Sequence, residues 1–196
     1  KLGLSKTAYN FMGGIMNSAE ALTAWFNPTI NSYKRINAPV TASGATWSPN
    51  TITYSGNNRT HMIRVPGPGR FELRLMDGAT NPYLLQAGIL AAGIDGINKK
   101  RKPGKPINLN MYEEAHKLKG AKKLPLNLNQ ALNHLDKSKV LKGAFGKDVI
   151  NSYITLKNRE IKKYNSSKDN KIGFKKSKSN KSNIITQWER DNTLDC

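Results

Sequence analysis

Apolar residues recur at helical spacing over the first 26 residues of the chain, at Leu4, Phe11, Ile15, Leu22 and Phe26. This pattern predicts an amphipathic helix over residues 2–26. The helix is expected to end at Asn27-Pro28, because a residue that precedes a proline is disfavoured in the helical conformation. Residues 27–58 are rich in Asn, Ser, Thr, Gly and Pro, and they predict a long loop region with one or two short strands.

Two strands are predicted over residues 60–65 and 70–76, with the turn Pro66-Gly67-Pro68-Gly69 between them. They are expected to form a β-hairpin. The apolar stretch at 83–97 predicts a buried helix, and its small residues allow close approach of neighbouring elements: Ala87, Gly88, Ala91, Ala92 and Gly93.

The second half of the chain shows three helical patterns, at 128–135, 138–145 and 147–164, and a last helix is expected over 184–194. Between them, residues 165–183 are rich in lysine and serine with few apolar anchors, which predicts a mobile insertion. The fold class expected from these elements is α+β: an antiparallel sheet backed by helices, with a helical C-terminal tail.

Composition excludes several classes of protein. The longest apolar run, at 84–94, is far shorter than the roughly 20 residues of a membrane-spanning helix. The single cysteine, Cys196, allows no internal disulfide and no cysteine-type zinc site, so a cytoplasmic location is expected. The chain begins with Lys1 inside an apparent helix, and we therefore expect it to be the C-terminal piece of a longer protein.

The net charge of +19 is unevenly distributed. Residues 1–98 carry eight basic and four acidic residues, whereas residues 99–196 carry 24 and nine. Two interpretations stay open: contact with a polyanion, as in a nucleic-acid-binding protein, and a compositional drift toward lysine, asparagine and isoleucine on solvated surfaces. The lysine-rich tract lacks the interleaved aromatic residues that stack nucleic-acid bases, which favours the second.

Arginine and lysine are also segregated along the chain. Between Arg35 and Asn98 there are five arginines and no lysine: Arg35, Arg59, Arg64, Arg70 and Arg74. A planar guanidinium holds phosphate or carboxylate oxygens through two parallel hydrogen bonds, which an ammonium group cannot do. This segment is therefore expected to bind an anionic ligand.

Within the second predicted strand, charged and apolar residues alternate. Arg70, Glu72 and Arg74 share one face because side chains alternate with period two. A solvent-exposed face with weak salt bridges would give the same pattern. Nearby Arg59 and Arg64 favour an anion site instead, and Glu72 supplies the carboxylate oxygen that Mg²⁺ prefers beside substrate phosphates.

Five motifs in this order resemble the glutamine synthetase family: residues 27–35 (NPTINSYKR), 58–60 (NRT), 63–66 (IRVP), 70–74 (RFELR) and 81–84 (NPYL). The resemblance covers residues 1–98 strongly and the remainder loosely, mainly through 153–164 and Trp188-Glu189. It implies that residues 1–98 form the C-terminal half of a glutamine synthetase and guanido kinase-like catalytic core. Residues 99–196 would be a basic, mostly helical region of the same domain.

The resemblance implies an ATP-dependent ligase that forms an amide on the γ-carboxylate of glutamate through γ-glutamyl phosphate. Arg35 and Arg74 would hold glutamate, Arg59 and Arg64 the phosphates, and Arg70 the nucleotide. Arg35 and Arg59 are expected among the catalytic residues, and Glu72 is expected to bind Mg²⁺ or Mn²⁺. The expected partners are glutamate and ammonia or a small amine, in a ring-forming homo-oligomer with neither nucleic acid nor membrane.

Two departures from the family pattern concern the nitrogen donor. Arg35 is followed directly by Ile36-Asn37-Ala38-Pro39, so the loop glutamate that assists ammonium deprotonation in many members is missing. The short Gly67-Pro68-Gly69 turn also replaces a lysine that usually precedes the Arg-x-Glu-x-Arg strand. The chain therefore resembles the branch that includes γ-glutamylmethylamide synthetase, and ammonia and an alkylamine both stay open as substrates.

Overall fold

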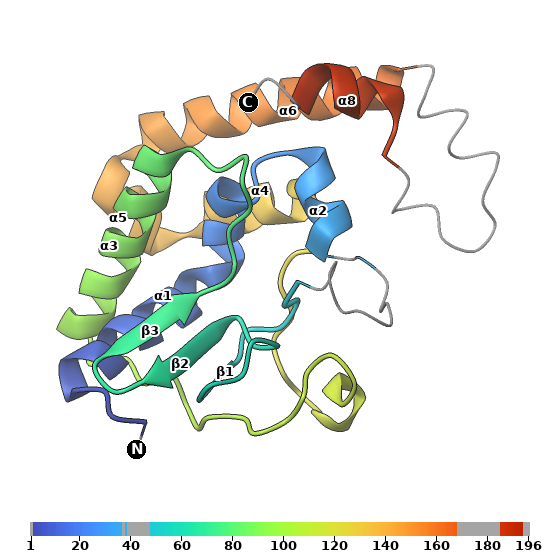
Figure 1. Ribbon diagram of the computed structural model, residues 1–196. Helices are drawn as coiled ribbons and strands as arrows, with labels where there is room; N and C mark the ends of the chain where they lie inside the picture. Colours follow the sequence, from blue (N-terminus) through green and yellow to red (C-terminus); the bar gives the residue numbers. More distant parts are fainter. Residues whose placement is uncertain (1, 37, 39–47, 168–184, 194–196) are drawn as a thin grey trace.

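A computed structural model describes residues 2–36, 38, 48–167 and 185–193 of the chain (Figure 1). The helices of this part are α1 (Lys6–Phe26), α2 (Ile30–Ile36), α3 (Pro82–Asn98), α4 (Leu128–Lys137), α5 (Lys139–Phe145), α6 (Lys147–Ser166) and α8 (Gln187–Thr193), with a 3-10 helix at Ala115–Lys117. Its strands are β1 (Tyr54–Ser55), β2 (Ile63–Gly67) and β3 (Arg70–Leu73), which form one small sheet. The predicted α+β class is confirmed.

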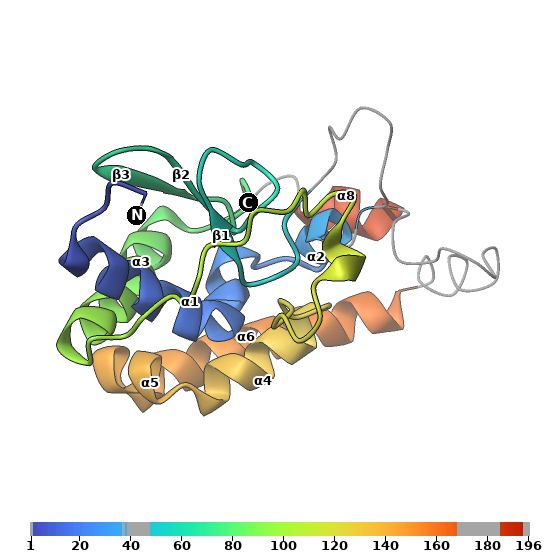
Figure 2. The same cartoon turned by 90° about the horizontal axis from the view of Figure 1, so that it is seen from below.

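Helix α1 lies at the centre of the fold. Figure 2 shows the sheet on one side of α1 and helices α4, α5 and α6 on the other, while α3 packs along α1. On the sheet side, the ring of Phe11 lies 6.4 Å from that of Phe71. On the helical side, Leu132 and Leu135 of α4 are buried in the same core cluster as α1.

Local signals explain where α1 and α3 begin. Ser5 accepts a hydrogen bond from the backbone N–H of Ala8, and α1 therefore starts at Lys6 and not at residue 2. The side chain of Asn81 caps α3 in the same way, and Pro82 occupies the first helical position. In both helices the cap satisfies backbone donors that have no partner inside the helix.

Glycine lets α1 and α3 approach closely. A Cβ atom on Gly14 would lie 2.0 Å from the carbonyl oxygen of Ala92, and one on Gly96 would lie 2.2 Å from that of Asn10. The close approach predicted from the small residues is confirmed at Gly88 and Gly93, where a Cβ atom would lie 3.0 Å from Leu22 and 2.2 Å from Phe11. The expectation of a buried helix is wrong for the opposite face, where Tyr83 and Leu90 are 84% and 55% exposed.

The predicted hairpin is confirmed. β2 and β3 pair antiparallel, with Ile63 opposite Leu73 and Arg64 opposite Glu72, and Gly69 in the turn has the positive φ that glycine tolerates. Strand β1, however, pairs parallel with β2. The sheet is therefore mixed and not purely antiparallel, because the chain between β1 and β2 crosses over and returns in the same direction.

Helix α2 lies in the region expected to be a loop. Its start is fixed by Thr29 and Ser32, each of which accepts a hydrogen bond from the backbone N–H of the other, at 3.1 Å in both cases. This reciprocal capping supports one turn of helix in a segment whose composition favours loops.

The C-terminal helices dock onto the end of α1. The hydroxyl of Tyr153 on α6 donates a 2.7 Å hydrogen bond to the carbonyl oxygen of Ala24, and Trp25 stacks edge-on against Phe145 and Tyr153. The three helical patterns predicted for residues 128–164 are confirmed as α4, α5 and α6. Of the expected lysine-rich insertion, residues 168–183 lie outside the described residues.

Candidate active site

The alternation along β3 places its charged residues on one face. Phe71 and Leu73 pack against the core, and Leu75 just beyond the strand is buried. Because successive side chains of a strand point to opposite faces, Arg70, Glu72 and Arg74 lie on the other side of the sheet. The face predicted from the sequence is thus formed as expected.

Glu72 joins two arginines from neighbouring strands. Its Oε2 atom accepts a 2.8 Å hydrogen bond from Nη1 of Arg64, and its Oε1 atom accepts one from Nη1 of Arg74. The Arg74 hydrogen bond is the main cause that lowers the pKa of Glu72, and Arg64 adds to it against the opposing effect of burial. The carboxylate is therefore ionised at neutral pH, flanked by two cations.

Arg64 has a second partner. Its Nε and Nη2 atoms donate hydrogen bonds of 2.9 and 2.5 Å to the Oδ1 atom of Asn57. The guanidinium is thus held between a carboxylate on β3 and an amide oxygen in the loop before β2. Its orientation is fixed before any ligand arrives.

The side chain of Arg35, on α2, extends to the residues just after β3. Its Nη2 atom donates hydrogen bonds to Oδ1 of Asn27, at 2.8 Å, and to the carbonyl oxygen of Leu75, at 2.9 Å. Burial lowers the pKa of Arg35, Asp77 raises it and Arg74 lowers it further. The guanidinium of Arg35 thus contacts the backbone of Leu75, the residue that directly follows Arg74.

Arg35 and Arg74 each have one N–H group without a hydrogen-bond partner among the described residues. The Nε atoms of Arg35 and Arg74 are buried and have no hydrogen-bond partner among the residues that the structure describes. Buried N–H groups are rarely left without a partner. Guanidinium groups are the side chains that hold a carboxylate or another anion through parallel hydrogen bonds.

Arg59 and Arg70 lie apart from this cluster. Arg59 is exposed and lines a surface cavity of about 750 Å³ together with Asn58 and Asn110. Arg70 is exposed at the tip of the hairpin. Within the described part of the chain, no hydrogen bond or ion pair joins either residue to Glu72.

Glu72 fits the role of a single metal ligand. An ionised carboxylate offers the hard oxygen atoms that Mg²⁺ and Mn²⁺ prefer, and its side chain is 38% exposed on the charged face. No group of three His, Cys, Asp or Glu residues that could hold a metal occurs within the residues described.

The buried histidine is not a candidate ligand. Nδ1 of His61 lies 2.9 Å from Oγ1 of Thr53, and Nε2 lies 3.0 Å from the carbonyl oxygen of Leu109. Both ring nitrogens therefore have partners. The histidine is part of the packing that supports β2.

Comparisons with known proteins match this chain over nearly its whole length. The family model for the catalytic domain of glutamine synthetase matches residues 1–173. A glutamine synthetase of Rhizobium leguminosarum bv. phaseoli is 54% identical over 193 residues, which are 98% of this chain and 40% of that protein. A glutamate–methylamine ligase of Methyloversatilis universalis is 45% identical over 166 residues, which are 83% of this chain and 37% of the relative.

The chain belongs to the glutamine synthetase family. A solved structure of a GmaS–ADP complex superimposes with a TM-score of 0.80 and 51% identity, covering all of this chain and 41% of the other. The resemblance stated from the five sequence motifs is confirmed, and so is membership of a family of ligases. The chain spans about 40% of the length of the relatives that it matches.

Two asparagines of this family member were not predicted as site residues. Asn27 is fully buried, and its Nδ2 atom donates a 2.9 Å hydrogen bond to the carbonyl oxygen of Leu75 while its Oδ1 atom accepts from Arg35. Asn57 holds Arg64. Asn27 belongs to a family motif, which is a usable signal, whereas Asn57 carries no signal in the sequence.

None of the described helices is long and apolar enough to span a membrane.

Proposed function

We propose that this chain forms the arginine-bearing part of an active site that makes an amide on the γ-carboxylate of glutamate with ATP. The observation that carries the proposal is the pair of guanidinium groups, Arg35 and Arg74, whose buried Nε donors have no partner among the described residues. Arg74 also donates a hydrogen bond to the ionised carboxylate of Glu72. This is a site for a carboxylate substrate next to a site for a cation.

In the proposed reaction, an oxygen of the γ-carboxylate attacks the γ-phosphorus of ATP, the bond to the bridging oxygen breaks and ADP leaves. The nitrogen donor then attacks the acyl carbon of γ-glutamyl phosphate, inorganic phosphate leaves and the nitrogen loses a proton. Phosphoryl transfer depends mainly on positioning and charge neutralisation. Arginines on a rigid sheet supply both.

The proposed division of work among the residues follows the glutamine synthetase motifs. Arg35 and Arg74 bind glutamate, and Arg35 also stabilises charge near the reacting carboxylate. Arg59 and Arg64 bind phosphate oxygens, with Arg59 as the second catalytic arginine, and Arg70 contacts the nucleotide at the hairpin tip.

Glu72 would be one protein ligand of a divalent cation. When bound, such a cation neutralises negative charge on the phosphoryl oxygens. The Glu72 carboxylate would also stay between the guanidinium groups of Arg64 and Arg74, since it accepts hydrogen bonds from both.

Both halves of the chain serve this site. Residues 1–98 carry every proposed ligand, while α4 packs against α1 and α8 contacts α2. A homo-oligomer of the full-length protein remains part of the proposal.

The test is release of ADP by the full-length protein. We expect release to require glutamate, a nitrogen donor and Mg²⁺ or Mn²⁺ together, with a γ-glutamyl amide detected by mass spectrometry. Release that is independent of glutamate, or that yields no γ-glutamyl product, would refute the proposed function.

Methylamine is a second candidate nitrogen donor. It is favoured by the missing loop glutamate after Arg35 and by the relatives named glutamate–methylamine ligase and GmaS. Ammonia is favoured by the relatives named glutamine synthetase. One buried methyl group contributes about 0.8 kcal/mol, and a limited preference of roughly fourfold for methylamine is therefore expected.

Competition between ammonium and methylamine at equal concentrations of free base separates these candidates. Mass spectrometry of the γ-glutamyl products gives the ratio directly. A preference for ammonia of about three orders of magnitude would assign the protein to ordinary glutamine synthesis.

A further inference from the structure

Helix α2 carries a site residue but is too short to hold its own position. It has seven residues, and isolated helices shorter than roughly 12–15 residues are marginal in water. Its position therefore depends on contacts with other elements. One contact is made by Arg35 itself, and another is the 3.5 Å hydrogen bond from the Tyr33 hydroxyl to the carbonyl oxygen of Thr23.

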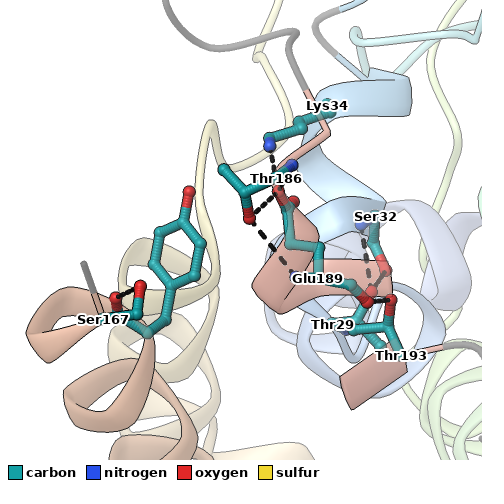
Figure 3. A network of polar contacts seen from close by, with 8 residues as sticks. Thr29, Ser32, Lys34, Ser167, Thr186, Glu189 and Thr193 are labelled. Carbon is teal, nitrogen blue, oxygen red and sulfur yellow. Dashed lines mark hydrogen bonds and ion pairs between the residues drawn. The ribbon is translucent and has the colours of Figure 1, made fainter. Parts of the chain in front are cut away.

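A third contact comes from the other end of the chain. Figure 3 shows Glu189 of α8 directed toward Lys34 of α2, and the carboxylate accepts a hydrogen bond from the ammonium group. The same carboxylate oxygen accepts from the backbone N–H of Thr186 at 2.7 Å and from its hydroxyl at 2.9 Å. Glu189 is 0% exposed and the Lys34 side chain 12%, so this is a buried ion pair.

The helix that carries Glu189 is itself anchored. Trp188 packs edge-on against Tyr164 of α6, with ring centroids 5.3 Å apart. The hydroxyl of Thr193 donates to the carbonyl oxygen of Glu189. The contact between Trp188 and Tyr164 therefore joins the helix that carries Glu189 to α6.

Lys34 and Arg35 are consecutive on α2 and point in different directions. Successive residues of an α-helix are about 100° apart around its axis. Glu189 therefore holds one side of the helix through Lys34, while Asn27 and Leu75 hold the other side through Arg35. Removing one partner of a buried ion pair leaves an uncompensated buried charge, so the two side chains stay together in one geometry.

We propose that Glu189 is a positioning residue for glutamate binding, acting through Lys34 to fix α2 and hence the guanidinium of Arg35. This inference rests on the proposed function of Arg35. It predicts that removing the Glu189 charge weakens the use of glutamate more than the use of ATP, since the nucleotide is bound by residues of the hairpin.

The main variant is Glu189→Gln in the full-length enzyme. The KM for glutamate is expected to rise roughly tenfold, with the KM for ATP within about twofold of wild type. Asp191→Asn is the matched control, because Asp191 lies on the same helix and its carboxylate accepts from the exposed Gln187. The control is expected to keep both KM values.

A double-mutant cycle with Lys34→Met separates positioning from loss of folding. Lys34→Met/Glu189→Gln leaves no lone buried charge, and its melting temperature is expected to exceed that of Glu189→Gln. If the two residues act as one unit, the double variant keeps the raised glutamate KM of the single variants. An additive rise, or equal rises of the glutamate and ATP KM values, overturns the proposal.

The outcome for Glu189 is distinguishable from that of the proposed function. A wild-type glutamate KM in Glu189→Gln, together with a raised KM in Arg74→Lys, overturns the role of Glu189 alone. Wild-type protein without glutamate-dependent ADP release overturns both.

Discussion

Arg35 and Asn27 are bonded to each other and to the same backbone carbonyl. Nη2 of Arg35 lies 2.8 Å from Oδ1 of Asn27, and both side chains donate to the carbonyl oxygen of Leu75. Leu75 follows Arg74 directly. The buried amide of Asn27 therefore ties the end of α1, the α2 arginine and the end of the charged strand into one unit.

Replacing Asn27 by alanine should damage both stability and glutamate binding. The change removes the acceptor of Arg35 and one donor to Leu75, and a buried polar group that loses its partner costs about 1–3 kcal/mol. We expect a lower melting temperature and a glutamate KM raised by roughly tenfold. Thermal unfolding and steady-state kinetics of the full-length variant measure the two effects, and an unchanged glutamate KM would show that Asn27 is only a helix terminator.

Arg74→Lys keeps the charge but loses the planar fork of donors. We expect kcat/KM for glutamate to fall by one to two orders of magnitude, which corresponds to about 1.4–3 kcal/mol. Arg101→Lys is the control, since Arg101 forms a 2.6 Å ion pair with Asp95 outside the charged face. Wild-type kinetics in Arg74→Lys would remove Arg74 from the glutamate site.

Glu72→Gln should abolish ATP-dependent ligation and weaken Mg²⁺ or Mn²⁺ binding, because a neutral amide is a poor ligand for these cations. The melting temperature should change little, since the side chain lies on the partly exposed face. Glu160→Gln, which also removes a carboxylate bonded to a basic residue, is the control. Should calorimetric titration with metal be identical in Glu72→Gln and wild type, Glu72 is only a partner of its arginines.

The burial of His61 predicts that the folded protein loses stability as the pH falls. Burial lowers its pKa below the ordinary value of 6.5, and the hydrogen bond to Leu109 opposes this only partly. The unfolded chain therefore binds a proton at a higher pH than the folded protein. The contribution of neutral His61 to the free energy of unfolding is complete above about pH 6.5. It is lost as the pH falls through the pKa of His61 in the folded protein.

Melting temperatures of the full-length protein between about pH 8 and pH 5 test this prediction. The slope of the melting temperature against pH should be smaller in His61→Gln than in wild type. His134→Gln is the matched control, because His134 is half exposed and lies 3.9 Å from Glu20. Equal slopes in wild type and His61→Gln would mean that other groups set the acid limit.

Much of the fold and part of the site followed from local patterns. Period-two alternation assigned Arg70, Glu72 and Arg74 to one face, and the turn glycine fixed the hairpin, because both signals lie within a few residues of one another. The capped starts of α1 and α3 are equally local. The five arginines without lysine indicated an anionic ligand before any fold was known.

Other features depend on contacts between distant residues, which no local pattern contains. The composition of residues 27–58 favours loops, yet α2 forms there because capping, Tyr33 and Glu189 hold it in place. Lys34 and Glu189 are 155 residues apart in the sequence, and both side chains of this ion pair are largely buried.

The sequence by itself determined which residue types face a ligand, because side-chain periodicity and turn chemistry act over a few residues. Only the tertiary structure decided how Arg35 is held and which arginines meet. Asn27 can bind both Arg35 and Leu75 only after α1 has packed against β3, 48 residues along the chain. Packing of that kind is a property of the whole core and not of any one segment.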